Sequence, residues 1–368
     1  MEKHQMCQRE KRTVCCMFGG KSTEYEVSLM SVTSVLQQID RGRYDVMMLG
    51  VTKDGRWLYY DGEVERISEN TWFTDKAHTY PAMFSPNFGE KTLFIMQADH
   101  TWTTRHVDVV FPVMHGSNAE DGTLQGLLTI CGIPYVGSGH CASAIAMDKE
   151  FTKCVAASLN IPQARHVVIR RGCAPDRAAS DALEKLGAFP LFVKPANAGS
   201  SIGTGKAYDH AQLCQAIVDA LQYDEKAIVE EYIAGREVEC AVIGTQTPHV
   251  SVPGQIDPGS DFYDYEAKYL KEGSTLHIPA PLMPRTAEEI RRYAAQIYQA
   301  LGCAGLSRVD FFVCGEGETE RVLFNEINTL PGFTDISMYP KLLMYEGMTY
   351  PQIIDRLIAL ACGEETEK

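Results

Sequence analysis

Two apolar segments near the C-terminal end carry polar side chains at alternate positions: LSRVDFFV (306–313) and RVLFNEINT (321–329). Because side chains alternate between the two faces of a strand, Arg308 and Asp310 share a face of the first segment. Glu326 and Asn328 share a face of the second in the same way. The turn-like stretch CGEGETE between the segments favours a hairpin. Such a hairpin presents two carboxylates, an amide and a guanidinium to one pocket.

These four polar residues suit a magnesium site. Carboxylate and amide oxygens are the hard ligands that Mg²⁺ prefers, and the ion completes its shell with water and substrate phosphates. The alternative is a solvated sheet edge with a surface ion pair. That alternative is weaker for the four residues together, because apolar neighbours such as Val309, Phe311 and Ile327 predict a largely buried sheet, where unpaired charge is costly.

Composition limits the class of protein. The chain has 368 residues, 45% hydrophobic and 22% charged, which predicts a globular protein of two or three domains. A net charge of -14 disfavours nucleic acid or an anionic membrane as a bulk partner. The first eleven residues are too polar for a signal peptide, and no apolar run approaches the ~18 residues of a spanning helix. Twelve scattered cysteines without a CxxC pair indicate a reducing cytoplasm.

Strand-like and helix-like stretches alternate along the chain, which predicts α/β layers that become α+β toward the C-terminus. The opening unit reads as βαβ, followed by a hairpin-rich insertion over residues 53–105 and a buried strand at 107–116. Single helices are predicted over 141–160 and 286–302. The expected divisions are a disordered leader (1–12), an N-terminal domain with an open parallel sheet (13–137), a central lobe (138–229) and a C-terminal lobe that carries the predicted metal residues (230–368).

The glycine-rich run 199–205 follows Lys194 and offers backbone N–H groups that can cover phosphates. It matches neither the P-loop nor GxGxxG, so a plain glycine hairpin stays open as an alternative. His115 ends a buried strand at the carboxyl edge of a sheet, where open α/β folds bind ligands, although a core histidine explains it equally well. Lys149 by itself reads as a solvated helix lysine. Glu26 begins a helix, where the helix dipole alone favours an acid.

Eight motifs in this order resemble the D-alanine–D-alanine ligase family of the ATP-grasp superfamily. They are GGKSTEYEVSL (19–29), HGSNAEDGTLQG (115–126), MDK (147–149), VKPANAGSSIG (193–203), VEEYIAGREVE (229–239), DFYDYEAKY (261–269), SRVDFF (307–312) and NEINTLPGFTDISMYP (325–340). The resemblance runs from about residue 13 to the C-terminus. It implies an ATP-grasp fold, in which an N-terminal domain is followed by two lobes that sandwich ATP.

The resemblance also implies the nucleotide and metal sites. The residues expected to contact ATP are Lys149, Lys194 and Ser201 near the phosphates, Glu230, Glu231, Tyr232 and Ile233 around the adenine hinge, Glu237 at the ribose, and Phe262. Asp310, Glu326 and Asn328 are expected to bind two Mg²⁺ or Mn²⁺ ions, which agrees with the strand-face argument. A monovalent cation is left open as a further cofactor.

The substrate site follows from the same resemblance. Glu26 is expected to hold the ammonium group of a first D-alanine and to connect through Ser200 to Tyr269, on a lid loop that closes with Lys268. His115 is expected near the substrate carboxylates. Arg308 and the backbone N–H of Gly332 are expected to form an oxyanion hole. The residues expected to line the second amino-acid subsite are Ser337 and Met338.

The implied activity is the ATP-dependent ligation of two D-alanine molecules through a D-alanyl phosphate, for peptidoglycan precursors, by a cytoplasmic homodimer. A D-alanine–D-serine ligase is the alternative enzyme. Apolar Met338 favours a methyl side chain, although an apolar pocket rejects a hydroxyl only weakly. A catalytically silent nucleotide-binding protein is the alternative from another class. Ala119 and Gly205 depart from the family pattern and put the geometry of their loops in question.

Overall fold

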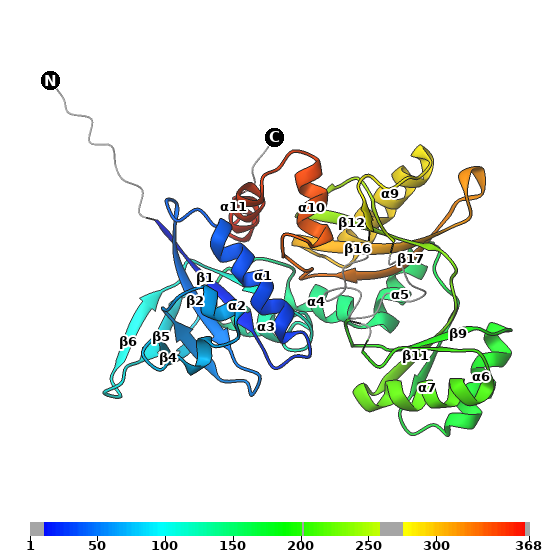
Figure 1. The fold of residues 1–368 in the computed structure, drawn as a ribbon, viewed down its shortest axis with the longest axis horizontal. Coiled ribbons are helices and arrows are strands. Elements are labelled where there is room, and N and C mark those ends of the chain that lie inside the picture. The colour runs from blue at the N-terminus through cyan, green and yellow to red at the C-terminus, as the bar shows by residue number, and fades with distance from the viewer. Residues whose placement is uncertain (1–10, 201, 258–274, 365–368) are drawn as a thin grey trace.

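The structure is a computed structural model that describes residues 11–200, 202–257 and 275–364. Three sheets, each covered by helices, lie in three bodies (Figure 1). The expected α/β architecture is present. Arg12 already begins the first strand, so of the expected disordered leader only residues 1–10 fall outside the description. No helix within the described ranges is both long enough and apolar enough to cross a membrane.

The N-terminal sheet has seven strands in the order β6-β5-β4-β3-β2-β1-β7. Its elements are β1 (Arg12–Gly19), α1 (Tyr25–Gln38), β2 (Tyr44–Val51), β3 (Trp57–Tyr60), α2 (Glu65–Ser68), η1 (Trp72–Thr74), β4 (Thr79–Phe84), β5 (Thr92–Met96), β6 (Trp102–His106), β7 (Val109–Val113) and α3 (Thr123–Cys131). β1 pairs in parallel with β2 and β7, as the βαβ prediction requires. The remaining neighbours are antiparallel, so the insertion over 53–105 is the predicted run of hairpins.

The predicted single helix over 141–160 is wrong. Two helices, α4 (His140–Met147) and α5 (Lys149–Ser158), meet at Asp148. The Asp148 carboxylate accepts hydrogen bonds from the backbone N–H groups of Glu150 (3.0 Å) and Phe151 (3.4 Å), which caps a new helix. The sequence hides this break, because helix-forming residues such as Ala146, Met147 and Glu150 stand on both sides of Asp148. Because of this break, Lys149 is the first residue of α5. Its backbone N–H donates a hydrogen bond to the Ala196 carbonyl at 3.0 Å.

The central sheet is antiparallel, in the order β10-β9-β11-β8. Its elements are β8 (His166–Arg170), α6 (Pro175–Leu186), β9 (Leu191–Pro195), β10 (Gly205–Ala207), α7 (His210–Tyr223) and β11 (Lys226–Glu231). Both helices lie side by side on the sheet (Figure 1), and Ala182 and Ile217 pack in one core with Val193 and Val229. The glycine-rich segment connects β9 to β10.

The C-terminal sheet follows the order β15-β14-β12-β16-β17, with β13 also paired to β12. Its elements are β12 (Arg236–Gly244), β13 (His249–Val250), β14 (Gly254–Asp257), β15 (Thr275–His277), α9 (Pro284–Ala300), β16 (Gly305–Cys314), η2 (Gly317–Thr319), β17 (Arg321–Asn328), α10 (Met338–Tyr345) and α11 (Tyr350–Ala361). One core joins this region to the N-terminal sheet, since Phe18 of β1 belongs to the same buried cluster as Leu342 of α10 and Ile354 of α11. Helix α9 covers the other face.

Candidate active site

The hairpin predicted from alternation is present. β16 and β17 pair antiparallel, with Arg308 opposite Asn328 and Asp310 opposite Glu326. The Arg308 guanidinium makes two hydrogen bonds to the Asp310 carboxylate, from Nε at 2.8 Å and from Nη2 at 2.7 Å. The Asn328 amide nitrogen donates to the same carboxylate at 3.0 Å. The two strands therefore present these polar side chains on one side.

A β-bulge interrupts this hairpin and adds a residue that alternation does not predict. The register changes between Asp310 and Phe311, which pair with Glu326 and Phe324, so Asn325 is the extra residue on β17. Asn325 and its neighbour Glu326 consequently both line the same cavity. The Asn325 amide oxygen accepts a hydrogen bond from Lys194 at 3.4 Å.

The larger cavity has a volume of about 500 Å³ and lies between the central and C-terminal lobes. Apolar side chains from both lobes form part of its wall: Phe192, Ile233, Val238, Ile256, Phe311 and Phe312. Charged side chains form another part: Lys149, Lys194, Glu230, Glu231, Glu237, Arg308, Asp310 and Glu326. Tyr232 also lines it. A flat apolar group with a polyanionic tail fits this combination.

A buried ion-pair network organises the cations of this cavity. Glu230 is 5% exposed and forms ion pairs with Lys194 at 2.8 Å through one oxygen and with Lys153 at 2.5 Å through the other. Burial alone would raise the pKa of Glu230, but the Lys194 and Lys153 ammonium groups lower it to about 2. The side chain of Glu230 therefore holds Lys194 in position. Lys153, which is 1% exposed, is a site residue that the sequence reading missed.

A smaller cavity of about 50 Å³ lies beside the larger one. Its lining includes Glu24, Glu120 and Asn328. The two cavities share part of their walls, formed by Lys149, Ala198, Gly199, Ser200 and Glu326. The Lys149 ammonium lies 3.6 Å from the Glu326 carboxylate and donates to the Ala198 carbonyl at 2.8 Å. Two molecules bound in the two cavities would thus meet beside a lysine and an acidic residue.

The expected position of Glu26 is wrong. Glu26 lies in the first turn of α1 on its exposed side and pairs with Lys53. The residue that meets Ser200 is Glu24, which is buried and accepts a hydrogen bond from the Ser200 hydroxyl. The approach is close enough that a Cβ on Gly199 would lie 2.8 Å from the Glu24 carboxylate. Helical periodicity was the missed signal, because Glu26 shares the exposed face of α1 with Met30.

Glu120 is a second acid that the sequence reading did not select. Its two oxygens accept from the backbone N–H groups of Gly116 (2.9 Å) and Leu330 (3.1 Å). Burial and the negative charge of Glu24 raise the pKa of Glu120 to about 8, against the effect of those two hydrogen bonds. Glu120 therefore retains its proton at neutral pH and reduces the repulsion between the two acids.

His115 is buried, and both of its ring nitrogens have partners within the protein. Nδ1 lies 2.9 Å from the Leu330 carbonyl, and Nε2 lies 3.2 Å from the Ser31 hydroxyl. Burial lowers the pKa of His115, so the ring is neutral. Because a carbonyl can only accept, Nδ1 carries the proton and Nε2 accepts from Ser31. His115 thus connects α1 to the segment after β17.

The remaining expected residues fall into two groups. Gly332, Ser337 and Met338 lie outside the linings of both cavities, and Met338 is buried in the core beside Gly254 and Leu342. Four others, Ser201, Phe262, Lys268 and Tyr269, lie outside the described residues. So does the lid loop expected over 258–275, except for Thr275, which begins β15.

The two departures from the family pattern leave the backbone undisturbed. Asn118, with a φ of 63°, takes the left-handed conformation of its loop, so Ala119 does not need glycine's freedom. Gly205 also lacks a positive φ, and a Cβ there would make an ordinary 3.4 Å contact with Ala216.

Asp310, Glu326 and Asn328 fit a hard divalent cation. The first two are register partners with carboxylates at one cavity wall, and the Asn328 amide turns its nitrogen to Asp310, which leaves its oxygen for a metal. Arg308, also bound to Glu239 at 3.1 Å, balances the negative charge of this group. The donor set has the oxygen chemistry that Mg²⁺ and Mn²⁺ require.

Comparisons with known proteins cover almost the whole chain. Residues 13–138 match the family model described as the D-ala D-ala ligase N-terminus, and residues 155–359 match the D-ala D-ala ligase C-terminus. The D-alanine--D-alanine ligase of Acetivibrio thermocellus is 45% identical over 365 residues, or 96% of each chain. Two similar solved structures are the VanG D-Ala:D-Ser ligase from Enterococcus faecalis (39% identity, TM-score 0.86, 96% of this chain and 100% of that one) and the D-alanine-D-alanine ligase from Coxiella burnetii (32%, 0.83, 96% and 94%).

Proposed function

Because this chain belongs to the D-alanine–D-alanine ligase family, we propose that it joins two D-alanine molecules into D-alanyl-D-alanine for peptidoglycan precursors, converting ATP to ADP and phosphate. The family resemblance seen in the sequence is confirmed. The observation that carries the proposal is the shared wall of the two cavities at Lys149, Ser200 and Glu326. An enzyme that phosphorylates a carboxylate must bring a nucleotide and an amino acid together in this way.

ATP occupies the larger cavity in this proposal. The adenine ring lies against the apolar wall, near Tyr232, Ile233 and the backbone of Glu230–Glu231, and Glu237 holds the ribose. Lys149 and Lys194 neutralise the charge of the phosphates, and the Ser201 hydroxyl hydrogen-bonds to them. Phe262 and Lys268 of the lid loop complete the site.

Asp310, Glu326 and Asn328 would hold Mg²⁺ ions, and the bound ions would supply neutralisation of the phosphate charge. Asp310 and Glu326 line the same cavity as Lys149 and Lys194, and Asn328 lines the adjoining smaller cavity, which supports this assignment.

The first D-alanine occupies the smaller cavity. Its ammonium group pairs with Glu24, and the Ser200 hydroxyl fixes the orientation of that carboxylate. The substrate carboxylate then points to the wall shared with the ATP cavity. One of its oxygens attacks the γ-phosphorus of ATP, the bond to the β-phosphate oxygen breaks, and ADP leaves. The product is D-alanyl phosphate, an activated acyl group.

The amine of the second D-alanine attacks the acyl carbon and forms a tetrahedral oxyanion. Arg308 and the Gly332 backbone N–H stabilise this oxyanion, and one such donor lowers the barrier by ~3 kcal/mol. Phosphate leaves as the carbonyl re-forms, and it can accept the amine proton. His115 positions the segment that carries Gly332. The second subsite lies at Ser337, which is next to Gly332, and the buried Met338 supports this segment from the core. The Tyr269 lid excludes water, which would hydrolyse the acyl phosphate.

Small molecules are therefore the partners of the chain, with no nucleic acid or membrane involved. We place the enzyme in the cytoplasm and assign it a homodimeric state. Free thiols at all eleven cysteines among the described residues agree with a reducing compartment.

One observation favours a second candidate, a D-alanine–D-serine ligase: the similarity to the VanG structure. Phosphate release and product mass, measured with D-alanine alone and with D-alanine plus D-serine, separate the two. We expect D-alanyl-D-alanine from D-alanine alone, and a mixed product as a minor species. Far higher turnover with D-serine would replace the proposal with this candidate, and the absence of ADP formation under either condition would favour a silent nucleotide-binding protein.

A further inference from the structure

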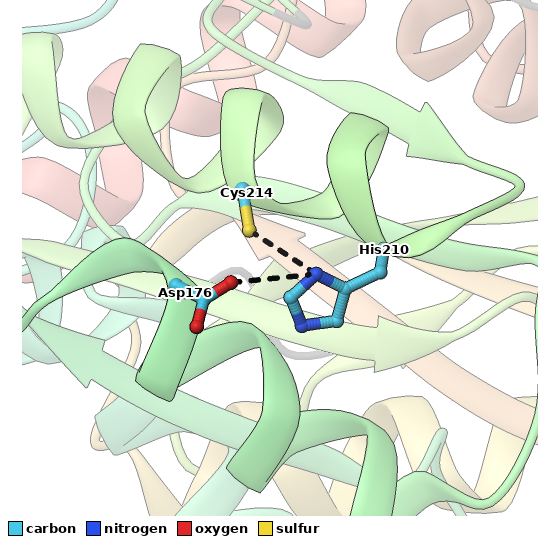
Figure 2. A group of neighbouring side chains, drawn as sticks. All are labelled: Asp176, His210 and Cys214. Carbon is cyan, nitrogen blue, oxygen red and sulfur yellow. Dashed lines mark hydrogen bonds and ion pairs between the residues drawn. The ribbon is translucent and has the colours of Figure 1, made fainter.

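Three metal-ligating side chains meet on the outer side of the central lobe, away from both cavities. Figure 2 shows Asp176 of α6 and His210 and Cys214 of α7 directed toward one another. His210 Nδ1 lies 3.8 Å from the Asp176 carboxylate and 3.6 Å from Cys214 Sγ. All three ligand atoms lie within 4.8 Å of one another. His210 and Cys214 are four residues apart on one helix, which places them on the same face.

The arrangement is unlike a nucleophilic relay. In a Cys-His-Asp relay, one imidazole nitrogen faces the nucleophile and the other faces the carboxylate. Here the thiol and the carboxylate both approach Nδ1, as the dashed lines of Figure 2 show. Three electron-pair donor atoms directed to one point are typical of a metal site.

A fourth residue, Ser180, determines which ring nitrogen of His210 carries the proton. The Ser180 hydroxyl donates its only proton to the Asp176 carbonyl at 3.0 Å, so it accepts from His210 Nε2 at 3.0 Å. In the neutral ring Nδ1 then carries a lone pair. That lone pair faces the carboxylate and the thiol sulfur, which are also electron-pair donors. A hydrogen bond from the second ring nitrogen is the usual support of a metal-bound histidine.

We propose that Asp176, His210 and Cys214 bind one Zn²⁺ ion, with water as the fourth ligand. Tetrahedral bonds of about 2.0 to 2.3 Å require the nitrogen and sulfur to be about 3.5 Å apart and the nitrogen and oxygen about 3.3 Å apart. The nitrogen–sulfur separation already matches. Asp176 is exposed, so rotation of its side chain can close the remaining gap in the nitrogen–oxygen distance. On binding, the Cys214 thiol releases its proton to solvent and the thiolate forms the bond to the metal.

Ligand chemistry separates this site from the proposed magnesium site. Thiolate and imidazole select Zn²⁺, whereas the oxygens of Asp310, Glu326 and Asn328 select Mg²⁺. The bound ion would link α6 to α7, the two helices that cover the central sheet. We therefore expect Zn²⁺ to raise the unfolding temperature of the protein.

Cobalt binding to the full-length, metal-free protein tests the proposal, because a Co²⁺–thiolate bond gives a near-ultraviolet charge-transfer band. Wild type should bind one Co²⁺ with this band, and Zn²⁺ should displace it. Cys214→Ser and His210→Ala should lose the band. Cys154→Ser removes an exposed cysteine elsewhere in the chain and should retain the band. Asp176→Asn should retain the band but bind at least about tenfold more weakly.

Magnesium-dependent ADP formation by each variant checks that it is folded, because none of these residues lines the active site. No thiolate band in the wild type, or a band that survives Cys214→Ser in an active variant, would overturn the proposal. Binding by Asp176→Asn as tight as that of wild type would overturn the three-ligand site.

Discussion

The hydroxyl of Ser200 donates a hydrogen bond to the carboxylate of Glu24, which lies 176 positions earlier in the chain. The contact joins the glycine-rich segment of the central lobe to the start of α1 in the N-terminal domain. Ser200 has a φ of 50°, an uncommon left-handed conformation for a residue other than glycine, and such conformations concentrate at functional sites. The amino-acid pocket is therefore assembled from parts of the chain that are distant in sequence.

Ser200→Ala removes this hydrogen bond and leaves the buried Glu24 carboxylate with one donor fewer. Loss of a hydrogen bond to a charged group costs ~2 kcal/mol, so kcat/KM for D-alanine should fall about thirtyfold. The KM for ATP should change little. Steady-state kinetics check this result, with the exposed Ser158→Ala as the control. Equal kinetics of Ser200→Ala and wild type would show that the contact does not orient Glu24.

Lys153→Met leaves Glu230 with Lys194 as its remaining cation. Removing one partner from a buried ion-pair network costs ~3 kcal/mol, and the free energy of unfolding should fall by that amount. The KM for ATP should also rise, because Lys194 becomes the sole counter-ion of Glu230. Urea unfolding and ATP kinetics measure the two effects. Lys185→Met, at an exposed position of α6, should stay within ~0.5 kcal/mol of wild type. A similar result for both variants contradicts the assigned role of Lys153.

Glu120→Gln should change how stability depends on pH. The folded pKa of Glu120 is raised to about 8, whereas the unfolded pKa is about 4.3. The stability that Glu120 contributes is thus fully present below the unfolded pKa, and it is lost as pH rises through the folded pKa. Relative to the variant, wild type should lose up to ~1.4 kcal/mol per pH unit in this window.

Urea unfolding of both proteins between about pH 5 and about pH 8 measures this difference. The exposed Glu184→Gln provides the control, and its stability should follow the wild-type pH dependence. A constant difference between wild type and Glu120→Gln across the window would mean that the Glu120 pKa is not raised.

Glu326→Ala should abolish Mg²⁺-dependent ADP formation, with at least a ~100-fold loss, because it removes a carboxylate from the metal group. Its free energy of unfolding should stay near that of wild type, since Glu326 is partly exposed at the cavity wall. Turnover as a function of Mg²⁺ concentration makes the measurement. Undiminished turnover at ordinary Mg²⁺ concentrations refutes the assigned metal role.

Alternation along β16 and β17 predicted the shared polar face, because successive side chains of a strand point to opposite faces of the sheet. The bulge at Asn325 escaped that reasoning, since it depends on pairing between strands. Lys153 escaped it because a buried lysine leaves no mark in a sequence, and its partner Glu230 lies on another element. The break at Asp148 was hidden because helix-forming residues stand on both sides of it, although aspartate is a strong cap.

The choice between Glu24 and Glu26 depended on where α1 begins. The sequence analysis assigned this role to Glu26 at the helix start and did not consider Glu24, two positions earlier. The helix begins at Tyr25, so Glu24 lies just before it and turns toward Ser200, while Glu26 is directed to Lys53. A difference of two residues on a helix places side chains on different faces, so a small error in the helix start reverses the assignment.

D-alanine-dependent ADP release by wild type, Glu24→Gln and Glu26→Gln tests whether this chain is a ligase whose first D-alanine is held by Glu24. We predict that wild type and Glu26→Gln release ADP at similar rates when D-alanine is added. Glu24→Gln should lose about a hundredfold or more in kcat/KM for D-alanine, because the substrate ammonium loses its buried counter-charge. A wild type without D-alanine-dependent ADP release, or a loss confined to Glu26→Gln, would contradict the account.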